Sequence, residues 1–125
     1  MPKILVIDDD KEFQDFLGFL LESRGFEVYR ALTADEGLNQ TVSIEPDLII
    51  LDVMMPGKNG FEAMKEIRSD ASTAGIPILV LTAIGEHLAH SRYARNMGLD
   101  IDSEDFITKP VDAKDLLGRV KAVLV

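Results

Sequence analysis

Cysteine is absent from the sequence, and so is any long hydrophobic run. Without cysteine the chain has no disulfide framework and no thiolate metal site, which suits a reducing cytoplasm. The longest apolar stretches are LIILDVMM and IPILVLTAI, and both are far shorter than a membrane span. The apolar run at the N-terminus is too short for the core of a secretory signal. We therefore expect a cytoplasmic protein with no membrane partner.

Basic residues are also scarce, because 13 lysines and arginines stand against 22 aspartates and glutamates and give a net charge of −9. A surface of this sign repels nucleic acid and anionic lipid, so we expect no direct nucleic-acid partner. A divalent cation or a basic protein surface fits the charge better. The composition, 46% hydrophobic and 28% charged, is typical of a folded protein. The length predicts a single domain over residues 1–125.

Apolar runs alternate with helical patterns along the chain. Five runs predict strands: KILVI, EVYRA, PDLIILD, IPILVLT and DFITKP. Helical spacing follows each of them, over about residues 10–25, 33–42, 61–67, 86–98 and 112–124. Strands that are apolar on both faces and are joined by helical crossovers predict an α/β fold. We expect a doubly wound parallel sheet of five strands, with five helices covering both of its faces.

The hydrophobic spacing also predicts which side of each helix faces the core. Asp10, Thr33 and Asp112 stand where helices should begin, and their side chains are predicted caps. The predicted core positions are Phe13, Phe16, Leu17, Leu20 and Leu21 in the first helix, Ala34, Leu38 and Val42 in the second, Phe61, Met64 and Ile67 in the third, and Leu116, Leu117, Val120, Val123 and Leu124 in the last.

Polar residues follow the predicted strands at their carboxyl ends. Asp8 and Asp9 end the first strand, Asp52 the third, Thr82 the fourth and Lys109 the fifth. Because parallel strands end at one edge of the sheet, these residues should converge there. A few uncaged carboxylates suit Mg²⁺, a lysine can hold a phosphoryl oxygen, and an aspartate can accept a phosphoryl group. The pattern predicts a cation-dependent phosphoryl-transfer site.

Four motifs in this order, VIDDD, LDVMMPGKNG, LTA and TKP, resemble the response-regulator receiver domain of two-component signalling. The resemblance covers the whole chain and implies a flavodoxin-like sheet with strand order 2-1-3-4-5. It implies a signalling domain rather than an enzyme, with self-catalysed phosphoryl transfer and autodephosphorylation. The implied cofactor is Mg²⁺, with Mn²⁺ as an alternative. The implied partners are a sensor histidine kinase or a histidine phosphotransfer protein. The face of the fourth helix, fifth strand and fifth helix would bind an effector domain or a second copy.

The resemblance also implies a role for each site residue. Asp52 would be the phosphoacceptor, and Lys109, followed by a cis peptide to Pro110, would pair with the phosphoryl group. Asp9 would bind the metal directly and Asp8 mainly through water. The full implied ligand set is Asp8, Asp9, Asp52 and the backbone carbonyl of Met54.

The resemblance also implies a conformational switch and a residue pair that sets the rate of dephosphorylation. Thr82 would move to hydrogen-bond the phosphoryl group, and Phe106 would change rotamer in step. Met54 and Ile84, two places beyond Asp52 and Thr82, would flank the phosphorus, and their apolar side chains predict slow hydrolysis. The segment LDIDSEDFIT carries a few more residues than the family's usual loop.

Two other functions stay open at this point. A phosphohydrolase of the haloacid-dehalogenase type also uses an aspartate at a first strand end, and DDD contains its Asp-x-Asp. The threonine that normally follows that motif is absent, and no cap domain fits in 125 residues. The second alternative is an interaction module that works without phosphorylation and whose phosphoacceptor site is inactive. For single residues, Asp8 and Asp9 also fit solvated acids at a helix start, and Phe106 also fits plain core.

Overall fold

Five parallel strands form one sheet in the order β2-β1-β3-β4-β5, which confirms the predicted fold. The computed structural model describes residues 1–53, 60–83, 95, 98 and 106–124. The strands are β1 (Lys3–Ile7), β2 (Glu27–Ala31), β3 (Leu48–Asp52), β4 (Ile78–Ala83) and β5 (Phe106–Lys109). The helices are α1 (Lys11–Glu22), α2 (Ala34–Ile44), α3 (Gly60–Ser69) and α5 (Ala113–Leu124). The helix predicted over residues 86–98 falls almost wholly outside the described residues.

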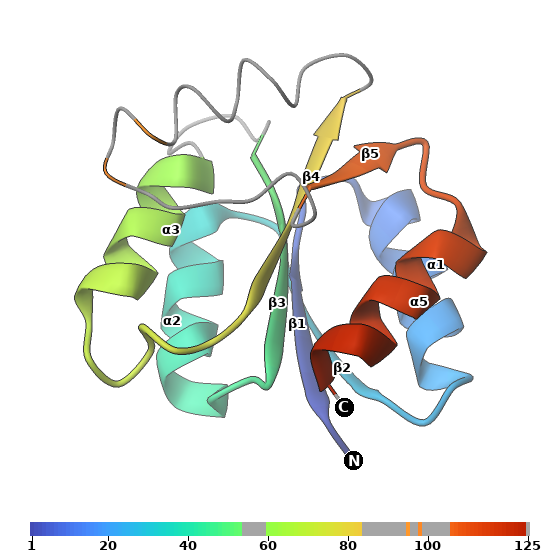
Figure 1. Ribbon diagram of the computed structural model, residues 1–125, viewed down its shortest axis with the longest axis horizontal. Coiled ribbons are helices and arrows are strands. Elements are labelled where there is room, and N and C mark those ends of the chain that lie inside the picture. Colours follow the sequence, from blue (N-terminus) through green and yellow to red (C-terminus); the bar gives the residue numbers. More distant parts are fainter. Residues whose placement is uncertain (54–59, 84–94, 96–97, 99–105, 125) are drawn as a thin grey trace.

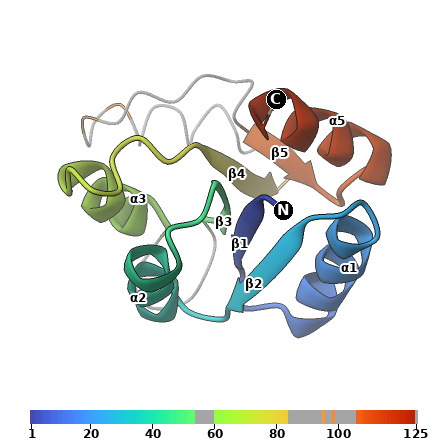
Figure 2. The same cartoon turned by 90° about the horizontal axis from the view of Figure 1, so that it is seen from below.

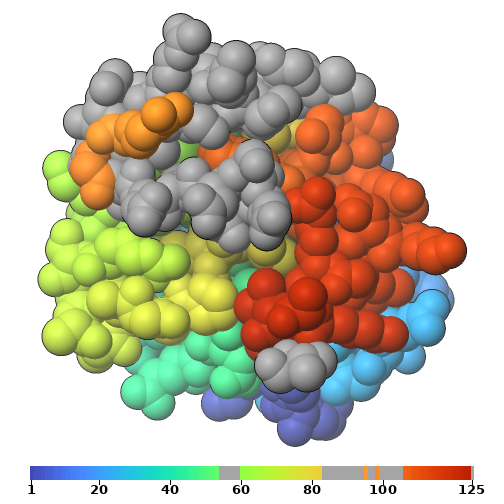
Figure 3. Space-filling view, in the orientation of Figure 1, coloured from blue at the N-terminus to red at the C-terminus, as the bar shows by residue number. Residues whose placement is uncertain are grey.

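The helices cover both faces of the sheet, two on each side within the described part of the chain. Figure 1 shows α1 and α5 on one face and α2 and α3 on the other. Figure 2, turned by 90°, shows the strands lying between the same two helix pairs. In the space-filling view α3 and α5 stand on opposite sides of the visible face (Figure 3). No helix of the described residues is long and apolar enough to cross a membrane.

Apart from Lys3, Asp52 and Thr82, the central strands β1, β3 and β4 are apolar, because each of their faces meets a helix layer. Along β1, Ile4 and Val6 pack on the α1 and α5 side, while Leu5 and Ile7 pack on the α2 and α3 side. This is the two-residue alternation of a strand, with both sets of side chains fully buried. At the edge, β2 is only partly buried, which matches its mixed sequence EVYRA. The sheet is therefore a rigid base for whatever stands at its carboxyl edge.

The buried faces of α1 and α2 differ from the predicted stripes. Phe16 is 43% exposed and Val42 is 62% exposed, and in α5 Val123 is 36% exposed, so the prediction of these three residues as core positions is wrong. Small residues face the sheet instead, since a Cβ on Gly37 would lie only 2.5 Å from Ile7 Cδ1, and one on Gly18 would collide with the Arg30 guanidinium. Counting hydrophobic side chains misses such faces because glycine carries no hydrophobic signal. The buried residues are Gln14, Leu17, Gly18 and Leu21 in α1, and Ala34, Gly37 and Thr41 in α2.

The predicted helix caps are confirmed. The Asp10 carboxylate accepts hydrogen bonds from the backbone N–H groups of Glu12 and Phe13. The Thr33 hydroxyl accepts one from Glu36 N at 3.1 Å. Asp112 accepts one from Lys114 N, also at 3.1 Å. Each cap satisfies an N–H group that the helix itself leaves unpaired, and the cap at Asp10 fixes how α1 departs from the end of β1.

Candidate functional site

Three carboxylates meet at the carboxyl edge of the sheet. In Figure 1 the strands run upward, so this edge is at their upper ends. Asp8 and Asp9 follow β1, and Asp52 ends β3, which pairs with β1 through Ile7 and Leu51. One oxygen of each carboxylate lies within 4.8 Å of the other two. Asp8 is fully buried and Asp52 is 5% exposed, whereas Asp9 is open to solvent. Three acidic oxygens at this spacing, one of them facing water, form a group that could hold a metal ion.

Lys109 reaches into this acidic group from β5. Its Nζ lies 2.7 Å from Asp8 Oδ2 and 3.3 Å from Asp52 Oδ2. The peptide bond between Lys109 and Pro110 is cis. Thr82 stands on β4, the strand between β3 and β5, and is 1% exposed. The structure thus brings one cation and one buried hydroxyl to the edge where the carboxylates lie.

The two oxygens of Asp8 already have protein partners. Oδ2 accepts the hydrogen bond from Lys109, and Oδ1 accepts one from Asp10 N at 3.0 Å. For Asp9, no hydrogen bond or ion pair joins the carboxylate to any other described residue. The difference favours Asp9 as the direct ligand of a cation and leaves Asp8 for contact through water.

Burial and crowding change the proton affinity of the site. Burial raises the pKa of Asp8, and the charge of Asp52 adds to the rise, while the hydrogen bonds from Lys109 and Asp10 N oppose it. Burial by itself would lower the pKa of Lys109, but the hydrogen bond to Asp8 and the charges of Asp52 and Asp8 outweigh it and raise that pKa. A single ammonium therefore leaves the buried acids incompletely neutralised.

A pH dependence follows for the metal-free protein. Because the pKa of Asp8 is higher in the folded state than its ordinary 3.8, the folded state binds a proton first as the pH falls. In EDTA, lowering the pH through the folded pKa toward 3.8 should raise the free energy of unfolding of the parent relative to Asp8→Asn. Urea titrations of both proteins between about pH 7 and about pH 4 measure this difference. If the difference in unfolding free energy does not change with pH, or decreases as the pH falls, the raised pKa of Asp8 is contradicted.

Gln14 supports the site and was missed by the sequence analysis. It is 2% exposed, and its Nε2 lies at hydrogen-bond distance from the carbonyl oxygens of Val6, Asp8 and Ala31, at 2.9, 3.1 and 2.9 Å. Asp8 N also donates to Ala31 O at 3.0 Å. The amide therefore joins the ends of β1 and β2 where Asp8 leaves the sheet. A lone glutamine in an amphipathic helix is normally counted as surface, but its spacing from Leu17 and Leu21 places it on the buried face.

Removing this amide should weaken the fold. Gln14→Met keeps the length of the side chain but removes a buried donor from three carbonyl oxygens, of which Ala31 O keeps its hydrogen bond from Asp8 N. We therefore expect a loss of about 2 kcal/mol of unfolding free energy. The control is Gln40→Met, which removes a solvent-exposed bond from Gln40 Nε2 to Arg30 O and should cost less than about 0.5 kcal/mol. Urea denaturation compares the two. Equal losses would mean that the buried amide has no special role.

Phe106 lies in the core on the α2 and α3 side of the sheet, 4% exposed. Its carbonyl oxygen accepts a hydrogen bond from Arg119 Nη1 at 2.8 Å, so the backbone of β5 is bonded to α5 at Phe106 itself. This geometry suits both readings of Phe106, as core and as a residue linked to the α5 surface. Met54, Ile84 and the longer loop before Phe106 fall outside the described residues.

Comparison with known proteins matches almost the whole chain. A family model described as the response regulator receiver domain matches residues 4–121. The DNA-binding dual master transcriptional regulator RpaA of Synechocystis sp. is 40% identical over 99% of this chain and 49% of its own length. The phosphate regulon transcriptional regulatory protein PhoB of Escherichia coli is 38% identical over 98% of this chain and 51% of its own length. The chain spans about half the length of these curated relatives.

Solved structures agree with the fold. A crystal structure from Chloroflexus aurantiacus has a TM-score of 0.86 at 33% identity, and covers 99% of this chain and 98% of that chain. A response regulator receiver domain protein from Clostridium thermocellum has a TM-score of 0.83 at 31% identity, over 99% of this chain and 94% of that chain.

The relatives correct one prediction. The expectation of no direct nucleic-acid partner is not borne out, since the Synechocystis relative is named as DNA-binding and PhoB as a transcriptional regulatory protein. The prediction used the net charge of −9 of these 125 residues. That charge carries no information about the other half of such relatives.

Proposed function

Because this chain belongs to the response regulator receiver domain family, we propose that residues 1–125 form a single receiver domain that accepts a phosphoryl group on Asp52. The donor would be a phosphohistidine of a sensor kinase or of a histidine phosphotransfer protein. The observation that carries the proposal is the meeting of Asp8, Asp9, Asp52 and Lys109 at one edge of the sheet. Phosphohistidine is made from ATP, so the proposal also places the chain in the cytoplasm.

The acidic group fits Mg²⁺, or Mn²⁺ in its place, because it offers carboxylate oxygens without a closed cage. Asp9, Asp52 and the backbone carbonyl of Met54 would hold the ion, and Asp8 would act through water. Bound there, the ion supplies charge neutralisation for the phosphoryl oxygens. A site with only one ammonium for two buried carboxylates has a net negative charge, which favours a divalent cation.

In the proposed step an oxygen of Asp52 attacks phosphorus while the bond from phosphorus to the donor's imidazole nitrogen breaks. The electron pair of that bond returns to the imidazole, and the phosphoryl group is left as a mixed anhydride on Asp52. Lys109, already 3.3 Å from Asp52 Oδ2, would turn its ammonium to a phosphoryl oxygen. Thr82 would donate its hydroxyl to another phosphoryl oxygen.

The signal would leave through β5 and α5. Phe106 starts β5, and its carbonyl oxygen is held by Arg119 of α5, so a shift at Lys109 has a short path to that surface. We propose this surface, with the predicted fourth helix, as the contact for an effector domain or a second copy. The apolar Met54 and Ile84 would slow hydrolysis of the phosphoryl group.

The test uses acetyl phosphate with Mg²⁺ and intact-mass measurement. We expect the parent to gain one phosphoryl group, and expect no gain in EDTA or in Asp52→Asn. Repeated turnover of phosphate esters without a stable adduct would favour the dehalogenase-type phosphohydrolase. An unmodified parent in the presence of Mg²⁺ would favour the silent interaction module.

A further inference from the structure

Lys109 has a third partner at the site, the aromatic ring of Phe13. Lys109 Nζ lies 4.4 Å from the centroid of this ring, within the range of a cation–π interaction. The same nitrogen lies 2.7 Å from Asp8 Oδ2 and 3.3 Å from Asp52 Oδ2. The ammonium is thus held by two carboxylates and by an aromatic ring from α1.

Phe13 is better fixed than the lysine that it contacts. Its backbone N–H is held by Asp10 at the start of α1, and its side chain packs on the core cluster between the sheet and α1. Its ring also rests against Phe16, with centroids 6.3 Å apart and a tilt of 39°. Lys109, in contrast, has a 29% exposed side chain with four rotatable carbons. The ring can therefore restrain the lysine.

A ring suits this position because of its charge distribution. An exposed lysine tends to extend its ammonium toward water. The face of a phenyl ring is negative, so it attracts the ammonium without taking any of its hydrogen bonds and without adding a formal charge. A further carboxylate would crowd a site where two acids already share one cation, and would compete with the phosphoryl group for it.

We propose that Phe13 is a positioning residue for phosphoryl transfer, which holds the Lys109 ammonium over Asp52 through a cation–π contact. The inference rests on the proposed function of Asp52 and Lys109. It adds a residue that none of the sequence motifs contains, since Phe13 lies beyond VIDDD on the first turns of α1. It also predicts that an aromatic ring, rather than mere bulk, is required at this position.

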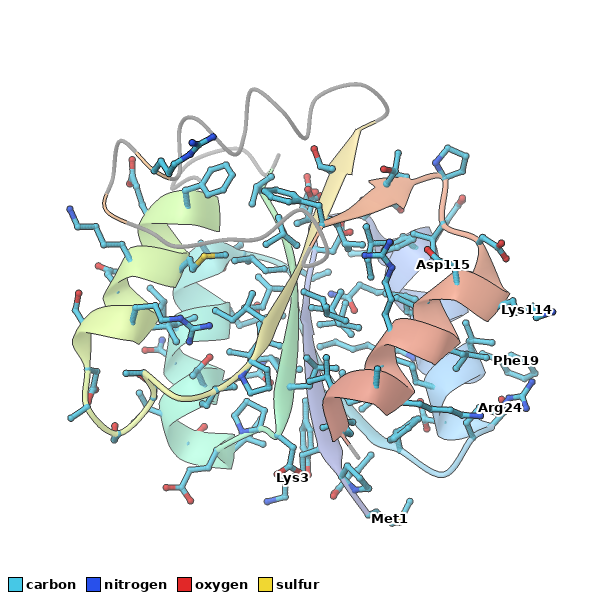
Figure 4. All side chains as sticks on the ribbon, viewed as in Figure 1. Met1, Lys3, Phe19, Arg24, Lys114 and Asp115 are labelled. Carbon is cyan, nitrogen blue, oxygen red and sulfur yellow. The ribbon has the colours of Figure 1, made fainter. Side chains whose placement is uncertain are left out.

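The first experiment compares rates of phosphorylation by acetyl phosphate in Mg²⁺, which needs no partner protein. Phe13→Leu keeps an apolar side chain but removes the ring, and should slow the rate about tenfold, or about 1.4 kcal/mol. Phe13→Tyr keeps the ring face and should stay within about twofold of the parent. The matched control is Phe19→Leu, in the same helix but 79% exposed and at the outer edge of α1 in Figure 4. It should leave the rate unchanged.

The second experiment needs no phosphorylation. In the parent, the ring should shift the NMR signals of the protons next to Lys109 Nζ upfield of those of the other lysines. Phe13→Leu should abolish this shift, while Phe13→Tyr and Phe19→Leu should keep it. If Phe13→Leu fails to fold, phenylalanines with increasing ring fluorination at position 13 replace it, because they keep the shape and weaken the negative face. Rates should then fall with each added fluorine.

The outcomes separate the two proposals. A parent that acetyl phosphate does not modify defeats the proposed function, while the NMR shift still tests the contact. A modified parent with an equal rate in Phe13→Leu overturns the role of Phe13. The role of Phe13 would also be overturned by an equal slowing in Phe13→Leu and Phe13→Tyr, or by rates that do not change with fluorination. Bulk or packing would then explain the effect.

Discussion

Asp52→Asn should abolish phosphorylation and, with the metal chelated, should raise the free energy of unfolding by about 1–2 kcal/mol. The first effect follows because the carboxylate oxygen that would carry the phosphoryl group is gone. The second follows from crowding, since Asp52 and Asp8 are both almost completely buried and approach within 4.8 Å. Both effects arise from the same carboxylate, so a single substitution tests both.

The balance of charges decides the sign of the stability change. With carboxylate oxygens no more than 4.8 Å apart and an effective dielectric near 20, Asp8 and Asp52 repel by at least about 3.5 kcal/mol. Lys109 Nζ attracts Asp52 Oδ2 at 3.3 Å by about 5 kcal/mol on the same scale, but it lies closer to Asp8, at 2.7 Å. Burying the charge of Asp52 costs several kcal/mol more. Repulsion and desolvation together exceed the attraction, so the neutral amide is favoured.

The measurement is urea denaturation of the parent and Asp52→Asn, in EDTA and in excess Mg²⁺. In Mg²⁺ the order should reverse, because only the parent keeps the full set of carboxylates and gains stability by binding the ion. The control is Asp15→Asn, which breaks a 2.7 Å ion pair with Arg30 at an exposed, uncrowded place. That variant should be unchanged or slightly less stable in both conditions. A clear loss of stability of Asp52→Asn in EDTA would mean that the pairing with Lys109 outweighs crowding.

The strands could be predicted from the sequence because both faces of the sheet are buried, Leu5 lying on one face and Ile50 on the other. Burial on both faces gives each strand a continuous apolar run. The strand order came from the resemblance, since periodicity describes one element at a time and order depends on contacts between elements. The buried faces of the helices were harder to predict. Gly37 packs against Ile7, and Phe16 is half exposed, because shape rather than hydrophobicity sets how closely a helix approaches the sheet.

The residues of the site also divide into those that the sequence predicts and those that it does not. Asp8, Asp52 and Lys109 could be placed together from the sequence, because a parallel sheet gathers the ends of its strands at one edge. Phe13 and Gln14 could not, since they reach the site from a helix and their targets are a side-chain nitrogen and three carbonyl oxygens. Such contacts depend on rotamers and on the angle of α1, which no local pattern encodes.

Neighbouring aspartates at the end of β1 should have opposite roles, which Asp9→Ala and Asp10→Ala can separate. Asp9 is exposed, and no hydrogen bond or ion pair ties its carboxylate to the described part of the chain, so its loss should barely change stability. Losing one carboxylate about 4 Å from a divalent charge costs about 2 kcal/mol even in water, so Mg²⁺ affinity should fall at least about thirtyfold. Phosphorylation by acetyl phosphate should fall with it.

Asp10 differs because its carboxylate caps α1 through the N–H groups of Glu12 and Phe13, at 3.0 and 3.2 Å. Asp10→Ala should therefore cost about 1 kcal/mol of unfolding free energy and leave Mg²⁺ affinity within about twofold of the parent. Calorimetric Mg²⁺ titration and urea denaturation of both variants complete the test. Asp9→Ala that binds Mg²⁺ as the parent does, or Asp10→Ala that loses binding while staying folded, would reverse the assignment. The cation would then lie nearer the helix start than the three clustered carboxylates indicate.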